Sequence, residues 1–191
     1  MPENATAVII AGGKSSRMLQ DKALLPFGGF SSLAQFQYER LNKLFSKVYI
    51  SSKEDKFTFH IEMIEDVNQV SSPLVALVSI FETLEINEVF VLSVDAPFVD
   101  EGVIKKLYEA RTSTADVTVA VSAHGLEPLC AIYNRSFVAK AKIAVEKNQH
   151  RLQTLFDDLE IKKVVFEEEE KFMNLNYPKE YAEAKILIYK R

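Results

Sequence analysis

The sequence predicts an α/β fold in which a mostly parallel β-sheet is covered by helices on both faces. Short β-rich runs alternate with longer amphipathic runs along the 191-residue chain, which is the pattern of a mainly parallel sheet. The run 6–11 is apolar throughout, as expected for a central strand covered on both faces. With 48% hydrophobic and 26% charged residues, the composition is that of a globular protein. We therefore expect a single three-layer α/β/α domain over residues 1–191.

The predicted strands are short apolar runs bounded by polar or turn-forming residues. The run 89–94 is the clearest buried strand, and it ends at Asp95-Ala96-Pro97. A turn around Gly125 separates two of the later strands. In chain order the predicted strands cover 6–11, 47–51, a short run near 63–64 that ends at Asp66, 89–94, 117–121, 128–133 and 164–166.

Helix-start signals precede several of the amphipathic runs. Ser32 and Gln35 have the spacing of a capping box, and Pro73 is suited to a first helical turn. Asp100 is suited to cap a helix in which apolar side chains recur on one face. The predicted helices cover 31–45, 73–84, a segment that begins after Asp100, 137–146, 152–159 and 179–189.

Charge and composition exclude several classes of partner. A net charge of −4 argues against binding to nucleic acid, because phosphate backbones require clustered Lys and Arg. Cys130 is the only cysteine; we interpret it as a small buried side chain, and its isolation favours a reducing compartment. The N-terminus lacks the organisation of a signal peptide, and no apolar run approaches the roughly 20 residues that span a bilayer. A cytoplasmic protein without a membrane partner is expected.

In open α/β sheets, ligands bind outside the carboxyl ends of the strands, where the strand order reverses. Polar residues directly follow an apolar run at four places in this sequence. These places are the loop after the first strand, the pair Ser51–Ser52, Asp66 and Asp95. The rule therefore predicts the ligand site among these four segments.

The loop from Ala11 to Lys22 has the composition of a phosphate-binding segment. Gly12 and Gly13 let the backbone turn sharply and bring its N–H groups close to a phosphate. Arg17 and Lys22 then supply positive charge for the outer phosphates. The alternative is a solvated surface loop in which the glycines serve only the turn. Neither the P-loop motif nor the dinucleotide-binding fingerprint is present, because their required glycines are missing.

Asp95 is the predicted metal ligand. A carboxylate at the end of a buried strand is costly unless it is paired or binds a cation, and Mg²⁺ beside a triphosphate takes one or two carboxylates together with phosphate oxygens. His60, His124 and His150 are interpreted as surface or turn residues rather than as catalysts. No general base is needed if the nucleophile is a phosphate, which is already ionised.

Five motifs, in order, resemble those of the MobA family of molybdenum cofactor guanylyltransferases, within the nucleotidyltransferase superfamily. The opening signature Ile9–Met18, followed by Asp21–Pro26, is the most specific of them. The resemblance implies a Rossmann-like fold of the nucleotide-diphospho-sugar transferase type. It also implies transfer of GMP from GTP to molybdopterin with release of pyrophosphate. The remaining motifs are Val89–Pro97, Leu126–Tyr133, Arg151–Leu155 and Asn174–Pro178.

The resemblance also implies a role for individual residues. Ile10, Ala11, Gly12 and Gly13 would hold the nucleotide, while Arg17 and Lys22 would hold its phosphates. Ser51 and Asp66 would lie beside the base and ribose. Asp95 would bind Mg²⁺ together with Asn176, and Asn174 and Asn176 would face the acceptor. The implied partners are GTP, molybdopterin and other proteins of cofactor biosynthesis.

Some positions depart from the family pattern. Leu19 stands where the family usually has glycine, and Ser72 and Ala76 replace both glycines of a further segment. Ser51 stands where some relatives have asparagine. Phosphate-binding residues do not distinguish one nucleotide base from another. The alternatives of a cytidylyltransferase acting on molybdopterin, or of an enzyme for another phosphorylated acceptor, therefore stay open. A non-catalytic nucleotide- or pterin-binding protein is the alternative from another class.

Overall fold

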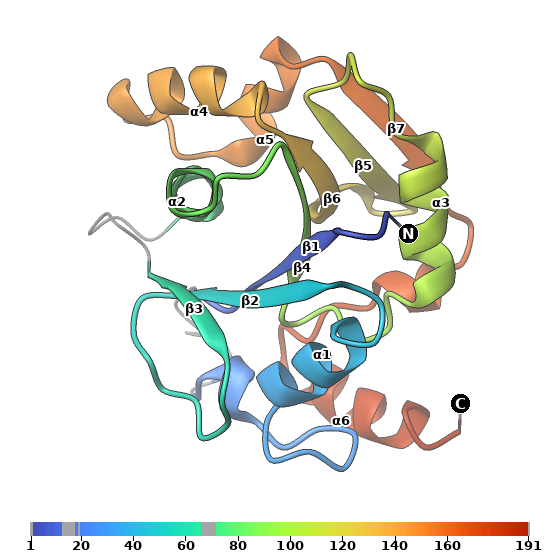
Figure 1. Cartoon of the computed structure of the whole chain (residues 1–191). Coiled ribbons are helices and arrows are strands. Elements are labelled where there is room, and N and C mark those ends of the chain that lie inside the picture. The colour runs from blue at the N-terminus through green and yellow to red at the C-terminus, as the bar shows by residue number, and fades with distance from the viewer. Residues whose placement is uncertain (1, 13–17, 19, 66–71, 191) are drawn as a thin grey trace.

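The computed structural model describes residues 2–12, 18, 20–65 and 72–190. Within these residues the strands form one seven-stranded sheet in the order β3-β2-β1-β4-β6-β5-β7. Figure 1 shows the sheet between two groups of helices. The strands are β1 (Thr6–Ile10), β2 (Lys47–Ser52), β3 (Glu62–Glu65), β4 (Glu88–Ser93), β5 (Val117–Ser122), β6 (Gly125–Asn134) and β7 (Ile161–Val165).

Helices occupy most of the connections between the strands. The α-helices are α1 (Leu33–Leu41), α2 (Pro73–Thr83), α3 (Glu101–Ala110), α4 (Phe137–Glu146), α5 (Leu152–Leu155) and α6 (Pro178–Leu187). The described residues also contain three 3₁₀ helices: η1 (Lys22–Leu24), η2 (Phe156–Asp158) and η3 (Glu169–Phe172). No helix of the described segments is long and apolar enough to cross a membrane.

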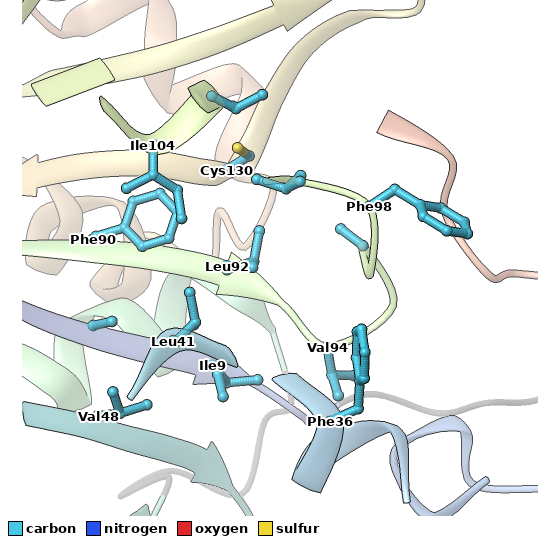
Figure 2. Close-up of a cluster of buried hydrophobic side chains, with 14 of the residues drawn as sticks. Ile9, Phe36, Leu41, Val48, Phe90, Leu92, Val94, Phe98, Ile104 and Cys130 are labelled. Atoms are coloured by element: carbon cyan, nitrogen blue, oxygen red, sulfur yellow. The ribbon is translucent and has the colours of Figure 1, made fainter. Parts of the chain in front are cut away.

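Two hydrophobic clusters lie on opposite faces of the sheet, which confirms the three-layer α/β/α prediction. Side chains of β1 alternate between them, with Ile9 in one cluster and Val8 and Ile10 in the other. The first cluster is covered by α1, α3 and α6, and the second by α2, α4 and α5. Figure 2 shows part of the first cluster, in which Ile9 and Phe90 point to the same side of the sheet. A central strand that is buried on both faces is mostly apolar, and in β1 the four residues after Thr6 are all apolar.

The sheet is mostly parallel, as predicted, and β6 is the exception. It runs antiparallel to both of its neighbours, β4 and β5. A tight turn between β5 and β6 forces this reversal, and Gly125 adopts a φ of 108° there, in the region that favours glycine. The strand order reverses between β1 and β4, since β2 and β3 lie on one side of β1 while β4 lies on the other.

The predicted helix boundaries differ from the observed ones at several ends. The helix predicted over 31–45 begins at Leu33 and ends at Leu41, because hydrogen-bonded turns take over after Asn42. Half of the predicted capping box forms: the Ser32 hydroxyl accepts from the Gln35 N–H, but the Gln35 side chain accepts from Ser31. The helix predicted over 152–159 splits into α5 and η2. The strand predicted at 164–166 begins earlier, at Ile161, through its pairing with β5.

Asp116, just before β5, is a buried carboxylate that joins three segments. Its side chain accepts hydrogen bonds from the Ser136 hydroxyl at 2.6 Å, the Lys140 ammonium at 2.9 Å and the Glu160 N–H at 3.0 Å. Burial would raise the pKa of this carboxyl, but the bonds from Ser136, Lys140 and Glu160 outweigh it and lower the pKa below its ordinary value. The ionised form is therefore the one that the fold stabilises.

We expect Asp116→Asn to lower the free energy of unfolding by about 1–2 kcal/mol at neutral pH, because it removes charge-assisted hydrogen bonds. The lowered pKa in the folded state means that this stabilisation is present above the unfolded pKa of about 4 and is lost as the pH falls through the folded pKa. Urea unfolding of both proteins at neutral and acidic pH measures the difference. A difference that grows on acidification would contradict this account.

Candidate functional site

The carboxyl ends of β2, β1 and β4 meet at one edge of the sheet. The Ala11 N–H donates to the Ser51 carbonyl at 2.9 Å, and the Val94 N–H donates to the Ile10 carbonyl at 3.0 Å. These bonds continue the parallel ladders just past the strand ends and align the three loops that follow. The edge lies at the reversal of strand order, so three of the four predicted ligand-binding places, including Gly12 and Asp95, adjoin one another there.

Lys22, Asp95 and Asn176 converge at this edge although they are distant in sequence. The Lys22 ammonium forms a salt bridge with the Asp95 carboxylate and donates to the Asn176 side-chain oxygen at 3.0 Å. The side chains of Lys22 and Asp95 are 16% and 15% exposed, so this pair is shielded from solvent but still reachable. The Ser93 hydroxyl donates to the second Asp95 oxygen at 2.5 Å. The Lys22 ammonium thus contacts a side-chain oxygen of Asp95 and one of Asn176.

The segment that carries Lys22 is tied to the end of β1 through Asp21 and a second lysine, Lys56. Asp21 is the N-cap of η1, and one of its oxygens accepts from the Ala23 N–H at 3.0 Å. Its other oxygen forms a salt bridge of 2.5 Å with Lys56, whose ammonium lies 3.5 Å from the Ala11 carbonyl. Lys56 was not among the predicted site residues. It ties η1 to the end of β1, and it adds a further positive charge beside the loop that follows β1.

The side chain of Gln37, on α1, holds the loop that carries Asp95 by hydrogen bonds. This buried amide donates to the backbone carbonyls of Ser93, Val94 and Ala96 at 3.0–3.3 Å. Its oxygen accepts in turn from Arg40, which also donates to the Pro97 carbonyl. A buried polar side chain in a helix is costly unless it is hydrogen-bonded. Its presence in an apolar stripe was the available signal that Gln37 positions another segment.

The segment from Asn174 to Asn176 is docked onto this loop by its backbone. The Leu175 N–H donates to the Asp95 carbonyl at 2.9 Å. Glu180 of α6 accepts from the N–H groups of Asn176 and Tyr177 at 2.6 and 2.8 Å, so the start of α6 anchors the same segment. The side chain of Asn176 therefore reaches Lys22 from a fixed backbone. This arrangement places the two asparagines beside Asp95.

A cavity of about 580 Å³ opens next to the cluster of Lys22, Asp95 and Asn176. It extends from Asp95 along β6 to the segment that leads into α5. Its size is that of a small-molecule site. The residues that line it are Pro73, Ser93, Asp95, Ala96, Val99, Glu127, Pro128, Leu129, Cys130, His150, Arg151, Leu152, Gln153, Phe172, Asn174 and Asn176.

Some polar residues of this cavity were not among the predicted site residues. Glu127 accepts from the Ser122 hydroxyl at 2.7 Å and has a side-chain hydrogen bond with Asn174. Burial raises the pKa of the Glu127 carboxyl above its ordinary value, and those two bonds offset part of the rise. His150 was interpreted as a surface or turn residue, but it is half-buried and lines the cavity together with Arg151. A charge inside an otherwise apolar strand was the available signal for Glu127.

The remaining predicted residues lie as follows. Ile10, Ala11 and Ser51 are buried at the strand ends, and Gly12 is exposed. Gly13, Arg17, Leu19 and Asp66 lie outside the described residues. Of the two positions where glycines are replaced, Ser72 is the N-cap of α2 and Ala76 is buried within it.

Cys130 is buried, as predicted, although it lines part of the cavity wall. Burial raises the pKa of its thiol well above the ordinary value, chiefly by desolvation. A thiol of this kind is not a nucleophile near neutral pH, so Cys130 acts as a small hydrophobic residue.

The described residues contain no group of three or more His, Cys, Asp or Glu side chains that could hold a metal ion. The oxygens of Asp95 and Asn176 nevertheless converge on one positive charge, that of Lys22. Carboxylate and amide oxygens are hard ligands of the kind that Mg²⁺ accepts, and Mg²⁺ takes its remaining ligands from phosphates and water. These two residues therefore fit a divalent cation that arrives with a polyphosphate.

Known proteins resemble this chain over most of its length. Residues 7–164 match the family model described as the MobA-like NTP transferase domain. A molybdenum cofactor guanylyltransferase from Campylobacter jejuni is 41% identical over 180 residues, which cover 93% of this chain and 94% of that protein. The chain belongs to the molybdenum cofactor guanylyltransferase family. A relative of the same name from Helicobacter pylori is 32% identical over 99% of this chain and 96% of its own length.

Membership of this family confirms the predicted enzyme class, that of a nucleotidyltransferase. Among solved structures, molybdopterin-guanine dinucleotide biosynthesis protein A from Archaeoglobus fulgidus superposes with a TM-score of 0.83. The alignment covers 97% of this chain and 100% of that one at 18% identity. At this identity the likeness supports the fold alone. A molybdenum cofactor guanylyltransferase thus has the Rossmann-like α/β/α architecture that the sequence predicted.

Proposed function

We propose that this guanylyltransferase transfers GMP from GTP to the terminal phosphate of molybdopterin and releases pyrophosphate. The observation that carries the proposal is the convergence of Lys22, Asp95 and Asn176, of which Asp95 and Asn176 line the cavity. A cation and two oxygen ligands there suit a metal-bound triphosphate, and the adjoining cavity suits an acceptor. The reacting phosphates of donor and acceptor would meet at this point.

The reaction requires little proton transfer from the protein. An oxygen of the acceptor phosphate forms a bond to the α-phosphorus of GTP, and the bond from that phosphorus to the bridging oxygen of pyrophosphate breaks. The acceptor phosphate is already ionised near neutral pH, so it needs no general base. Positioning and neutralisation of charge on the equatorial oxygens supply the catalysis.

The predicted residues divide between the two substrates. Backbone groups of Ile10–Gly13 would hold the nucleotide, and Lys22 with Arg17 would bind its phosphates. Ser51, at the end of β2, and Asp66 would lie by the base and ribose. Asn174 and Asn176 would face the acceptor, in keeping with their place beside Asp95 and along the cavity.

Mg²⁺ is the proposed cofactor, with Asp95 and Asn176 as its protein ligands. When bound, it would supply positive charge that stabilises the developing charge on the phosphates. Lys22 contacts both of these side chains in the structure. Its ammonium would add positive charge for the phosphates beside these two ligands.

The proposal covers the whole chain as one nucleotidyltransferase domain, residues 1–191, acting in the cytoplasm. The single buried Cys130 is consistent with a reducing compartment. GTP and molybdopterin are the proposed small-molecule partners. Other proteins of cofactor biosynthesis are proposed as further partners.

The proposal is tested by calorimetric titration with Mg-GTP and Mg-CTP, followed by pyrophosphate release in the presence of molybdopterin. We expect preferential binding of GTP and release of pyrophosphate only when both substrates are present. A clear preference for CTP would replace the guanylyltransferase proposal with a cytidylyltransferase. If wild type, Lys22→Ala and Asp95→Ala bound GTP but were equally inert with molybdopterin, a non-catalytic binding protein would be the better description.

A further inference from the structure

The wall of the cavity contains an irregular stretch of β6. Along the β5–β6 ladder, Val119 pairs with Ala131, but the next residue, Ala120, pairs with Glu127. Pro128–Cys130 therefore have no partner on β5, and the backbone bulges there. Bulges redirect side chains and often lie next to active sites. Here four consecutive residues, Glu127–Cys130, line the cavity, which the alternation of a regular strand would not allow.

The bulge is held in its position by the protein itself. The Tyr133 hydroxyl donates to the Pro128 carbonyl at 2.8 Å, and Tyr133 is fully buried. Glu127 is oriented by the Ser122 hydroxyl and by Asn174. The carboxylate is thus a fixed acceptor in a half-buried place. An ionised carboxylate has about four lone-pair sites, so these two contacts leave capacity for further donors.

The surroundings of Glu127 suit a flat heteroaromatic ring. Apolar walls are provided by Pro73, Val99, Leu129, Leu152 and Phe172. An apolar wall can cover a ring face, and a carboxylate in the same cavity selects rings that present two adjacent N–H donors. A pterin presents this pair as its N3–H and its 2-amino group, which match the two oxygens of a carboxylate.

We propose that the Glu127 carboxylate binds the N3–H and 2-amino edge of the pterin of the acceptor, and so determines the ring specificity of the acceptor site. This inference rests on the proposed function. Guanine presents the same pair of donors, so the two substrates share this chemistry. The sheet order favours the acceptor: Glu127 lies on β6, on the far side of β4 from β1 and β2, whereas Ser51 lies at the end of β2.

The test is a change of ring preference in Glu127→Gln. A glutamine keeps one acceptor oxygen but replaces the other with a donor, so it opposes the 2-amino group of pterin. Lumazine carries a 2-oxo group in place of that amine and retains the N3–H, so it matches glutamine. The affinities of free pterin and lumazine can be followed by pteridine fluorescence, with little protein background because the chain has no tryptophan.

We expect wild type to prefer pterin and Glu127→Gln to lose at least about tenfold in pterin affinity, with the preference reversed toward lumazine. Glu109→Gln, an exposed change on α3, is the matched control and should behave as wild type. Thermal unfolding verifies that both variants are folded. An unchanged preference in Glu127→Gln, or no pterin binding by wild type, would overturn the inference.

Because guanine and pterin present the same pair of N–H donors, calorimetry with Mg-GTP tests which of the two rings Glu127 contacts. The dissociation constant for Mg-GTP should be the same in wild type and Glu127→Gln. A loss of GTP affinity with unaltered pterin preference would show that the carboxylate contacts guanine, and would overturn the inference. Pyrophosphate release by wild type with molybdopterin tests the proposed function separately, so the two can fail independently.

Discussion

Replacing Asp95 with asparagine is expected to lower kcat for GMP transfer by about two to three orders of magnitude, with a much smaller effect on nucleotide affinity. Asp95 is a carboxylate that forms a salt bridge with Lys22 and lines the cavity. Asparagine preserves its size and one oxygen but removes the negative charge that would hold a divalent cation. Turnover should therefore suffer more than binding.

The measurement is steady-state pyrophosphate release over a range of Mg²⁺ concentrations. Asp95→Asn should need far more Mg²⁺ for its residual activity than wild type does, and calorimetry should still detect GTP. Asp158→Asn, an exposed change in η2, is the matched control and should leave kcat unaltered. Equal activity of wild type and Asp95→Asn would count directly against Asp95 as the metal ligand.

Replacing Lys22 with alanine is expected to weaken Mg-GTP binding by about 10- to 100-fold. The Lys22 ammonium lies where η1 meets the ends of β1 and β4, and it is largely shielded from solvent. A charge-assisted hydrogen bond to phosphate is strong in such a place, because water does not compete fully for it. The same substitution also removes the counterion of Asp95.

Calorimetric titration of the Lys22→Ala variant with Mg-GTP measures this loss. Lys22→Arg keeps the charge in a bulkier, forked group, and we expect it to bind more weakly than wild type but more tightly than Lys22→Ala. Lys163→Ala, an exposed change on β7, is the control for removal of a positive charge. A dissociation constant unaffected by Lys22→Ala would refute a phosphate-binding role for this residue.

Much of the architecture was predictable because its signals are local. The apolar run of β1 indicated a strand buried on both faces, and Asp100 indicated the start of α3, where it accepts from the Val103 N–H at 3.0 Å. Boundaries were less predictable, as the early end of α1 illustrates. Helix ends depend on competing turns and tertiary contacts that periodicity does not encode.

The candidate site was predictable where a residue directly follows a buried strand. Asp95 and Gly12 follow that rule, and the structure places both at the same edge of the sheet. Lys56 and Gln37 could not be found in this way. Their contribution depends on partners distant in sequence, the Asp21 carboxylate and the carbonyls around Asp95.

The sequence by itself determined the order of strands and helices along the chain and the resemblance to the guanylyltransferases, and it predicted a phosphate-binding role for the loop after β1. Periodicity, helix caps and motif spacing depend on residues close together in sequence, so they can be recognised without knowledge of the tertiary structure. Only the tertiary structure decided that Lys22 meets Asn176 across 154 positions and that a bulge turns Glu127 into the cavity. Such contacts follow from strand order and register, which arise from packing of the whole chain.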